Sequence, residues 1–133
     1  MNLPTAEKLL QHPVVKVAFE TAWADSFADD ENQRHEEGGW ILMDANDGRI
    51  IIRRELPGIR DELAFRPPDM SSPLVILAMY HTHPTPAVGG EKSDPSQADC
   101  LIARDWKIPS FVIAETAIFI IDVNGNVTLG EWK

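Results

Sequence analysis

Two histidines separated by one residue follow an uninterrupted apolar run. The run Leu74–Tyr80 leads directly into His81 and, one residue later, His83. If this run is a β-strand, side chains two residues apart point to the same face, so both imidazoles can reach one metal ion. A turn-rich segment then brings up Ser96 and Asp99. Two histidines and one carboxylate form the ligand set of a catalytic zinc, which keeps a fourth position open for water.

The serine and the aspartate fall at the start of a predicted helix. Asp94 is the expected N-cap and Pro95 the first helical residue, and the helix is expected to run to about residue 106. Ser96 and Asp99 would then be i and i+3, hence neighbours on one helix face. Asp99 could complete the metal site, with the serine hydroxyl beside the open position. Each residue also has an ordinary structural interpretation, the serine as a partner of a backbone N–H and the aspartate as a favourable charge near the helix N-terminus.

A zinc hydrolase also needs a general base, most often Glu or Asp. Residues 28–37 hold many charges and no apolar periodicity, which predicts an exposed loop before the first strand. Glu36 and Glu37 stand directly ahead of Gly38 at the end of this loop, and both are candidates for the base. The acids earlier in the loop are expected to be solvated.

The remaining pattern predicts a mixed α/β domain with helices packed on a largely antiparallel sheet. The run at 74–83 is expected at the centre of the sheet, because its unbroken apolar character suggests cover on both faces. Asn46-Asp47-Gly48 and Asn124-Gly125 are tight hairpin signals. We expect helices at 5–11, 13–27 and 95–106, a linker at 59–73, and strands at 40–43, 49–56, 74–83, 111–114, 117–121 and 127–129.

Composition places this pattern in one ordinary domain, residues 1–133, with 44% hydrophobic and 25% charged residues. The formal net charge of −9 argues against a general nucleic-acid binder, which would need Lys and Arg to neutralise phosphates. Cys100 is the only cysteine, so neither a disulfide framework nor a cysteine-rich zinc site can form within the chain. The sequence has no bilayer-spanning apolar stretch and no secretory signal at its start, so no membrane partner and a cytoplasmic location are expected.

Three short segments form one joint pattern: Glu36-Glu-Gly-Gly39-Trp-Ile-Leu, His81-Thr-His83-Pro and Pro95-Ser96-Gln-Ala-Asp99. The pattern resembles the motif of the JAMM (JAB/MPN) metalloproteases, in which an upstream Glu is followed by His-Ser/Thr-His-Pro and then by Ser-x-x-Asp. The resemblance covers about residues 36–121. In the family, the Glu commonly stands three residues before a Gly that opens an apolar strand, and this selects Glu36 over Glu37.

The resemblance implies a JAB/MPN-like (cytidine-deaminase-like) mixed, largely antiparallel sheet flanked by helices, and zinc-dependent hydrolysis of peptide or isopeptide bonds. His81, His83 and Asp99 would bind one Zn²⁺, Glu36 would be the general acid/base, and Ser96 would help to stabilise the oxyanion. Many members of the family cleave after the C-terminal glycines of ubiquitin or ubiquitin-like proteins. A ubiquitin-like protein or its conjugate is therefore the expected partner and substrate, in deconjugation or in precursor processing.

The sequence departs from the family pattern in one place. Twelve residues separate His83 from Ser96, more than the family usually has, and the shorter spacing would select Glu91 and Asp94 instead. Asp99 is preferred because Pro-Ser-x-x-Asp precedes an apolar helix, and Asp94 stays as the alternative third ligand. Two alternative functions are a zinc hydrolase of another small amide and a metal-free scaffold of the same fold that binds proteins. A zinc deaminase would need Pro-Cys-x-x-Cys, which the chain lacks.

Overall fold

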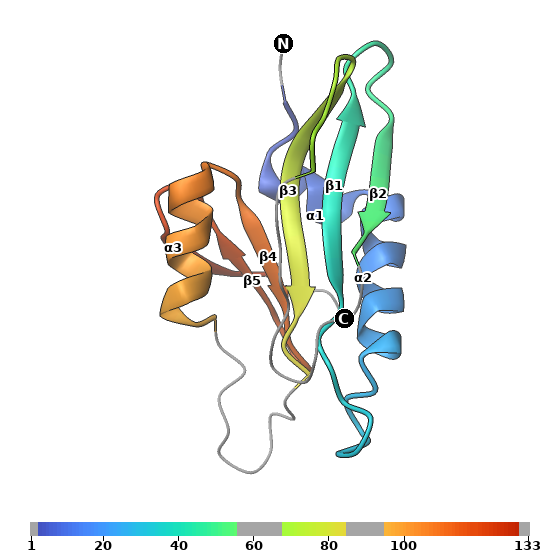
Figure 1. Cartoon of the computed structure of the whole chain (residues 1–133), viewed down its shortest axis with the longest axis vertical. Helices are drawn as coiled ribbons and strands as arrows, with labels where there is room; N and C mark the ends of the chain where they lie inside the picture. The colour runs from blue at the N-terminus through green and yellow to red at the C-terminus, as the bar shows by residue number, and fades with distance from the viewer. Residues whose placement is uncertain (1–2, 56–67, 85–94, 131–133) are drawn as a thin grey trace.

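The described part of the chain forms one mixed β-sheet with helices on both faces (Figure 1). The computed structural model describes residues 3–55, 68–84 and 95–130. Within these ranges the sheet has six strands in the order β2-β1-β3-β4-β5-β6. The elements are α1 (Ala6–Gln11), α2 (Pro13–Asp25), β1 (Gly38–Asp44), β2 (Ile50–Arg54), β3 (Leu74–Thr82), α3 (Gln97–Trp106), β4 (Ser110–Ile113), β5 (Ile118–Ile121) and β6 (Val127–Gly130).

The sheet is largely antiparallel, with one parallel pair between β3 and β4. The connection between these two parallel strands contains α3, as parallel neighbours require a crossover. The predicted mixed α/β class and the central position of the strand at residue 74 are therefore confirmed. None of the helices in the described ranges is long and apolar enough to cross a membrane.

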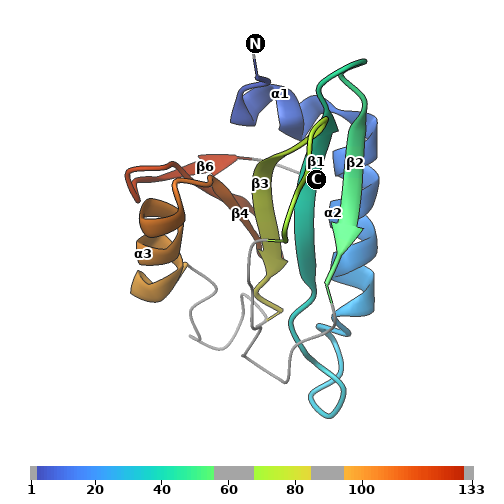
Figure 2. The ribbon, with the colours of Figure 1, turned by 45° about the horizontal axis from the view of Figure 1, so that its top comes forward.

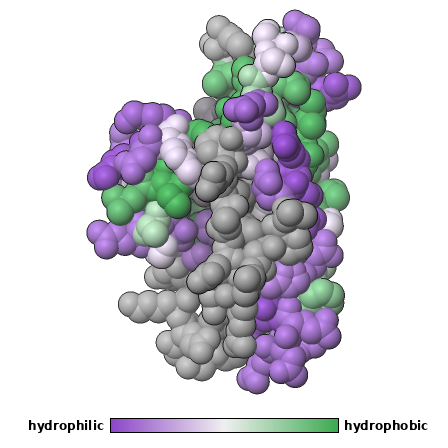
Figure 3. Space-filling model, viewed as in Figure 1, coloured by the Kyte–Doolittle hydropathy of each residue, from purple (hydrophilic) through white to green (hydrophobic). Residues whose placement is uncertain are grey.

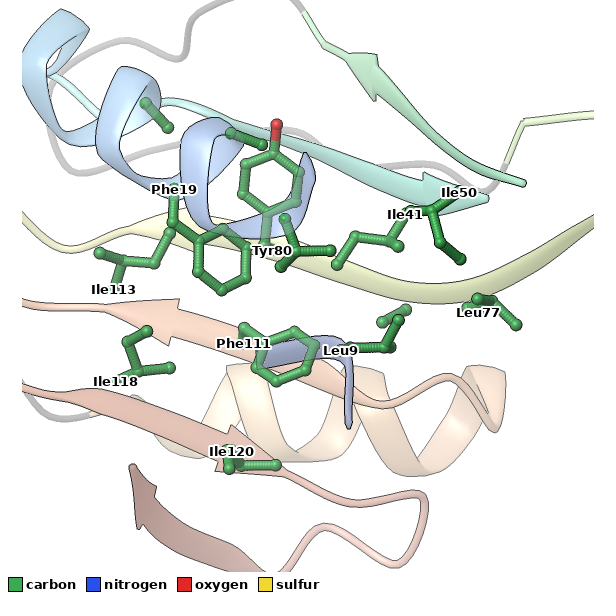
Figure 4. Close-up of a cluster of buried hydrophobic side chains, with 14 of the residues drawn as sticks. Leu9, Phe19, Ile41, Ile50, Leu77, Tyr80, Phe111, Ile113, Ile118 and Ile120 are labelled. Carbon is green, nitrogen blue, oxygen red and sulfur yellow. The ribbon is translucent and has the colours of Figure 1, made fainter. Parts of the chain in front are cut away.

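Strand alternation divides the apolar residues between two cores, one on each face of the sheet (Figure 2). α1 and α2 cover one face and α3 covers the other. The α1/α2 core is shown in Figure 4, where Phe19 packs against Tyr80 and Phe111. The α3 core contains Trp40, Leu42, Met79, Ala103, Val112 and Ile121. Cover on both faces explains why β3 is an unbroken apolar run.

Local signals place most of the element ends. Thr5 caps α1 by accepting the Lys8 N–H, and Pro13 is the first residue of α2. α2 ends at Asp25, earlier than the expected residue 27, because Phe27 takes a left-handed φ of 52° that cannot continue a helix. Gly48 and Gly125, at φ of 76° and 85°, occupy the two predicted hairpin turns, and tight hairpin turns require such positive φ angles.

A β-bulge interrupts the pairing of β3 with β1. Ile41 pairs with Ala78 but Leu42 pairs with Ile76, so Leu77 is an extra residue on β3. Before the bulge, Val75 contacts the α1/α2 core, and after it Met79 belongs to the α3 core. The bulge therefore changes which face the odd-numbered residues of β3 occupy.

Candidate metal centre

Three segments meet at the carboxyl end of β3. They are the loop that precedes β1, the end of β3 itself and the first turn of α3, and all three lie in the lower half of the molecule in Figure 1. The loop presents a mostly hydrophilic surface at the lower right of Figure 3, in agreement with its many charges. The candidate site residues of the sequence pattern come from these three segments.

His81 and His83 lie on the α3 face of the sheet. Their odd numbers place them in phase with Met79, which belongs to the α3 core, whereas Thr82 points to the opposite face. His81 is buried between β1 and β4, because it pairs with Gly38 on one side and Val112 on the other. The predicted shared face of the two imidazoles is confirmed.

The two imidazoles and Asp99 form a compact donor triangle. The Nε2 atoms of His81 and His83 are 3.2 Å apart. The Asp99 carboxylate lies 3.4 Å from His81 Nε2 through Oδ1 and 3.3 Å from His83 Nε2 through Oδ2. Ligands about 2.0–2.1 Å from a tetrahedral zinc are separated by about 3.3–3.4 Å. The donor types and their separations therefore fit a zinc ion bound by these three residues.

Asp99 is held by the helix start as well as by the histidines. Ser96 is the N-cap of α3: its Oγ accepts the Asp99 N–H at 3.1 Å, and Asp99 Oδ2 accepts the Ser96 N–H at 2.8 Å. The expectation that Asp94 caps this helix is wrong, since the reciprocal capping box starts at Ser96. Asp94 and Glu91 themselves lie outside the described residues, so Asp94 as the third ligand stays an alternative.

The electrostatics of Asp99 match a ligand carboxylate. Burial raises the pKa of Asp99, but hydrogen bonds from His81 and His83 outweigh it and hold the pKa well below its ordinary value. The carboxylate is therefore anionic throughout the neutral range, as a metal ligand must be. Ser96 is exposed, and because its oxygen accepts the Asp99 N–H, its hydroxyl hydrogen is left to donate to another group.

Glu36 completes the cluster from the loop before β1. One carboxylate oxygen of Glu36 and one ring nitrogen of each histidine all lie within 4.8 Å of one another. The strand pairing explains this position, because Gly38 pairs with His81 and Glu37 O accepts the Thr82 N–H. Continuing that register places Glu36 opposite His83, on the same face of the sheet. Glu36 therefore belongs to the candidate metal centre.

Glu37 points to the other face and belongs to a different network. Its carboxylate accepts hydrogen bonds from His35 Nε2, at 2.5 Å, and from Arg54, which also pairs with Asp25. Burial lowers the pKa of His35, but its hydrogen bonds to Gln33 and Glu37 outweigh this effect, and the net pKa is raised. The expectation of an exposed loop is wrong for its last two residues, because both glutamates are buried.

Sequence reasoning missed the polar contacts behind the metal centre. Neither Thr82 nor Ser26 was assigned a role from the sequence. Ser26 is fully buried, and its hydroxyl oxygen lies 2.6 Å from that of Thr82. The sequence offered one indication of these contacts, which is a polar Thr, rather than an apolar residue, at the position between the two histidines.

Comparison of the chain with models of protein families, with curated proteins and with solved structures returned no match. The chemical assignment of this site therefore rests on its donor atoms and their arrangement. Within the described residues, the cluster of Glu36, His81 and His83, joined by Asp99, is a possible metal centre.

Proposed function

We propose that the chain is a zinc-dependent hydrolase of amide bonds, of the JAMM (JAB/MPN) type. The observation that carries the proposal is the convergence of Glu36 with His81, His83 and Asp99 from three separate segments. The spacing of the donor atoms suits tetrahedral zinc. Glu36 also lies within reach of a bound ion, and we assign it the role of base because the JAMM-like pattern does so.

The ligands in this proposal are His81, His83 and Asp99, each through one atom, with one zinc ion per chain. Zinc bound there would polarise the scissile carbonyl and lower the pKa of a water molecule. One anionic and two neutral ligands leave the site a net positive charge. This charge favours attack on a carbonyl, where negative charge develops.

The chain's own groups divide the proton chemistry. Glu36 takes a proton from the attacking water and delivers it to the leaving amine, which requires a carboxylate near the ligands but not among them. The Ser96 hydroxyl donates its hydrogen to the developing oxyanion, since its oxygen already accepts the Asp99 N–H. These roles correspond to the residues that the JAMM-like pattern selects.

We propose further that the substrate is the C-terminal glycine tail of a ubiquitin-like protein, cleaved during deconjugation or precursor processing. The support is the joint pattern of Glu36, His81-Thr-His83-Pro and Ser96-x-x-Asp99, which resembles that of proteases acting on such tails. A mixed sheet with helices on both faces is compatible with a JAB/MPN-like fold.

Metal analysis and a cleavage assay test this function. The purified protein should hold one zinc per chain and should cleave a ubiquitin-like fusion after its Gly-Gly junction. The His81→Ala variant should lose both zinc and cleavage, because it removes one of three ligands. Cleavage of other peptides but not of the fusion would restrict the function to a zinc hydrolase of a different amide. A folded native protein without zinc would contradict the proposal and favour a metal-free binding scaffold.

A further inference from the structure

A chain of hydrogen bonds lies behind the metal centre, on the opposite face of the sheet. Thr82 lies between the two histidines in the chain and makes two hydrogen bonds with Glu37, the residue after Glu36. Its N–H donates to Glu37 O at 2.8 Å, and its Oγ1 accepts the Glu37 N–H at 3.0 Å. The chain continues from Thr82 Oγ1 to Ser26 Oγ at 2.6 Å, and from Ser26 Oγ to Ala22 O at 2.8 Å.

The donors in this chain can be assigned by elimination. Ala22 O can only accept, so the Ser26 hydroxyl donates its one hydrogen to it. Because the Ser26 hydrogen is used in that bond, the hydrogen between the two hydroxyls comes from Thr82, whose Oγ1 also accepts the Glu37 N–H. Every hydroxyl in the chain then donates once and accepts once. The order runs from the Glu37 amide to the last turn of α2.

Burial keeps this chain of hydrogen bonds away from solvent. Thr82 and Ser26 are both fully buried, and water cannot replace a hydroxyl that is removed there. Ser26 also receives the His35 N–H through its backbone carbonyl, which closes the loop between α2 and β1 on itself. The Glu37 side chain is anchored separately by Arg54 and His35. The loop segment beside Glu36 is therefore fixed by its neighbours rather than by contacts of Glu36 alone.

We propose that Thr82, supported by Ser26, is the positioning residue that sets the placement of Glu36 against the two histidines. Thr82 belongs to the same strand end as both imidazoles, so its two bonds to Glu37 tie the base-bearing segment to the ligand-bearing strand in one register. This inference rests on the proposed function, because it assigns Glu36 the role of base. A displacement of such a base by about one ångström costs up to about 100-fold in rate.

Thr82→Val is the decisive substitution, because valine keeps the shape and removes the hydroxyl. Thr82→Ser keeps the hydroxyl and should restore the wild-type behaviour. Ile118→Val removes one methyl group from a fully buried side chain on β5, two strands from Thr82, and serves as the control for a general loss of packing. Ser26→Ala breaks the next link and replaces Thr82→Val as the test if that variant does not fold.

Two measurements decide the inference. In the zinc-loaded protein, Thr82→Val should lower kcat about 10–100-fold with KM and zinc content unchanged, and Ile118→Val should change none of these. In the metal-free protein, nuclear Overhauser contacts between Glu36 side-chain protons and the His83 ring should be present in the wild type and in Thr82→Ser but lost in Thr82→Val.

The possible outcomes separate the two proposals. An unchanged kcat with the contacts retained in Thr82→Val would overturn the positioning role. An equal loss of kcat in Ile118→Val, or a loss of zinc in Thr82→Val, would overturn it as well, because the effect would then be general. A wild type that cleaves no amide but shows contacts that depend on the Thr82 hydroxyl would refute the proposed function and leave the positioning intact.

Discussion

The adjacent glutamates should respond in opposite ways when each is replaced by glutamine. Glu36 faces the histidines and Glu37 faces Arg54 and His35, so one substitution tests chemistry and the other tests stability. An amide cannot take a proton from water. Glu36→Gln should therefore lower kcat by about 10²–10⁴-fold while the protein keeps its zinc and its fold.

Glu37→Gln should weaken the fold with little effect on the rate. The Glu37 side chain is only 5% exposed and serves two donors, and a glutamine oxygen cannot replace both carboxylate oxygens. Breaking a fully buried pair costs about 3–5 kcal/mol. Because the Arg54 side chain is 33% exposed and stays partly solvated, we expect a loss of about 1–3 kcal/mol in the free energy of unfolding.

Parallel measurements of melting and cleavage distinguish these effects. For a chain of this length, 1 kcal/mol corresponds to about 4 °C in Tm, so Glu37→Gln should melt about 4–12 °C lower and still cleave at a rate near that of the wild type. Its backbone bonds to Thr82 are unaffected by the substitution, which keeps Glu36 in place. A folded Glu37→Gln variant without cleavage, beside an active Glu36→Gln, would refute the assignment of the two faces.

Three further outcomes follow from the contacts at the site and beside it. Asp99→Ala should lose zinc while Asp94→Ala keeps it, because Asp99 lies 3.3–3.4 Å from both imidazoles; loss in Asp94→Ala alone would transfer the ligand role. Ser96→Ala should lose about 1 kcal/mol of stability, because the helix cap is removed, and about 100-fold in kcat. Ser96→Asp should recover the stability but not the rate. Full activity in either variant would exclude an oxyanion role for Ser96. The raised pKa of His35 adds stability that is present below pH 6.5 and is lost as pH rises through the folded pKa. The difference in unfolding free energy between wild type and His35→Gln, measured by urea titration, should therefore shrink from acid to alkaline pH. A constant difference would contradict the His35–Glu37 pair.

The sequence predicted the elements better than their junctions. The apolar run of β3 and both hairpin turns follow from residue types alone, because an unbroken apolar run suits a strand covered on both faces and Gly adopts positive φ without steric cost. The predicted start of α3 was wrong, because it placed the cap at Asp94 although Ser96, on the other side of the same proline, is an equally good capping residue. The structure selects Ser96 because Asp99, three residues later, supplies the reciprocal half of the capping box.

The position of Glu36 could be predicted only in part. Charge density correctly marked residues 28–37 as a loop, but it could not show that the last two residues pair with the end of β3. That pairing is a long-range contact between residues about 45 apart in the chain. Once it exists, alternation alone places Glu36 on the face of the two histidines and Glu37 on the other. The choice of Glu36, made on the resemblance, therefore agrees with a simple geometric rule.

The face of the histidines depends on the bulge at Leu77, for which the sequence carries no signal. Val75 and Leu77 contact the α1/α2 core, and a regular strand would continue with residue 81 on that same side, away from Asp99. The extra residue reverses the phase, so that Met79 joins the α3 core and His81 faces the helix that carries Asp99. Every residue in the run 74–79 is apolar and suits either face of the sheet. The hydrophobic pattern of such a run therefore cannot show where the side chains change from one face to the other. The bulge thus directs two side chains toward a third residue elsewhere in the fold, as bulges near functional sites do.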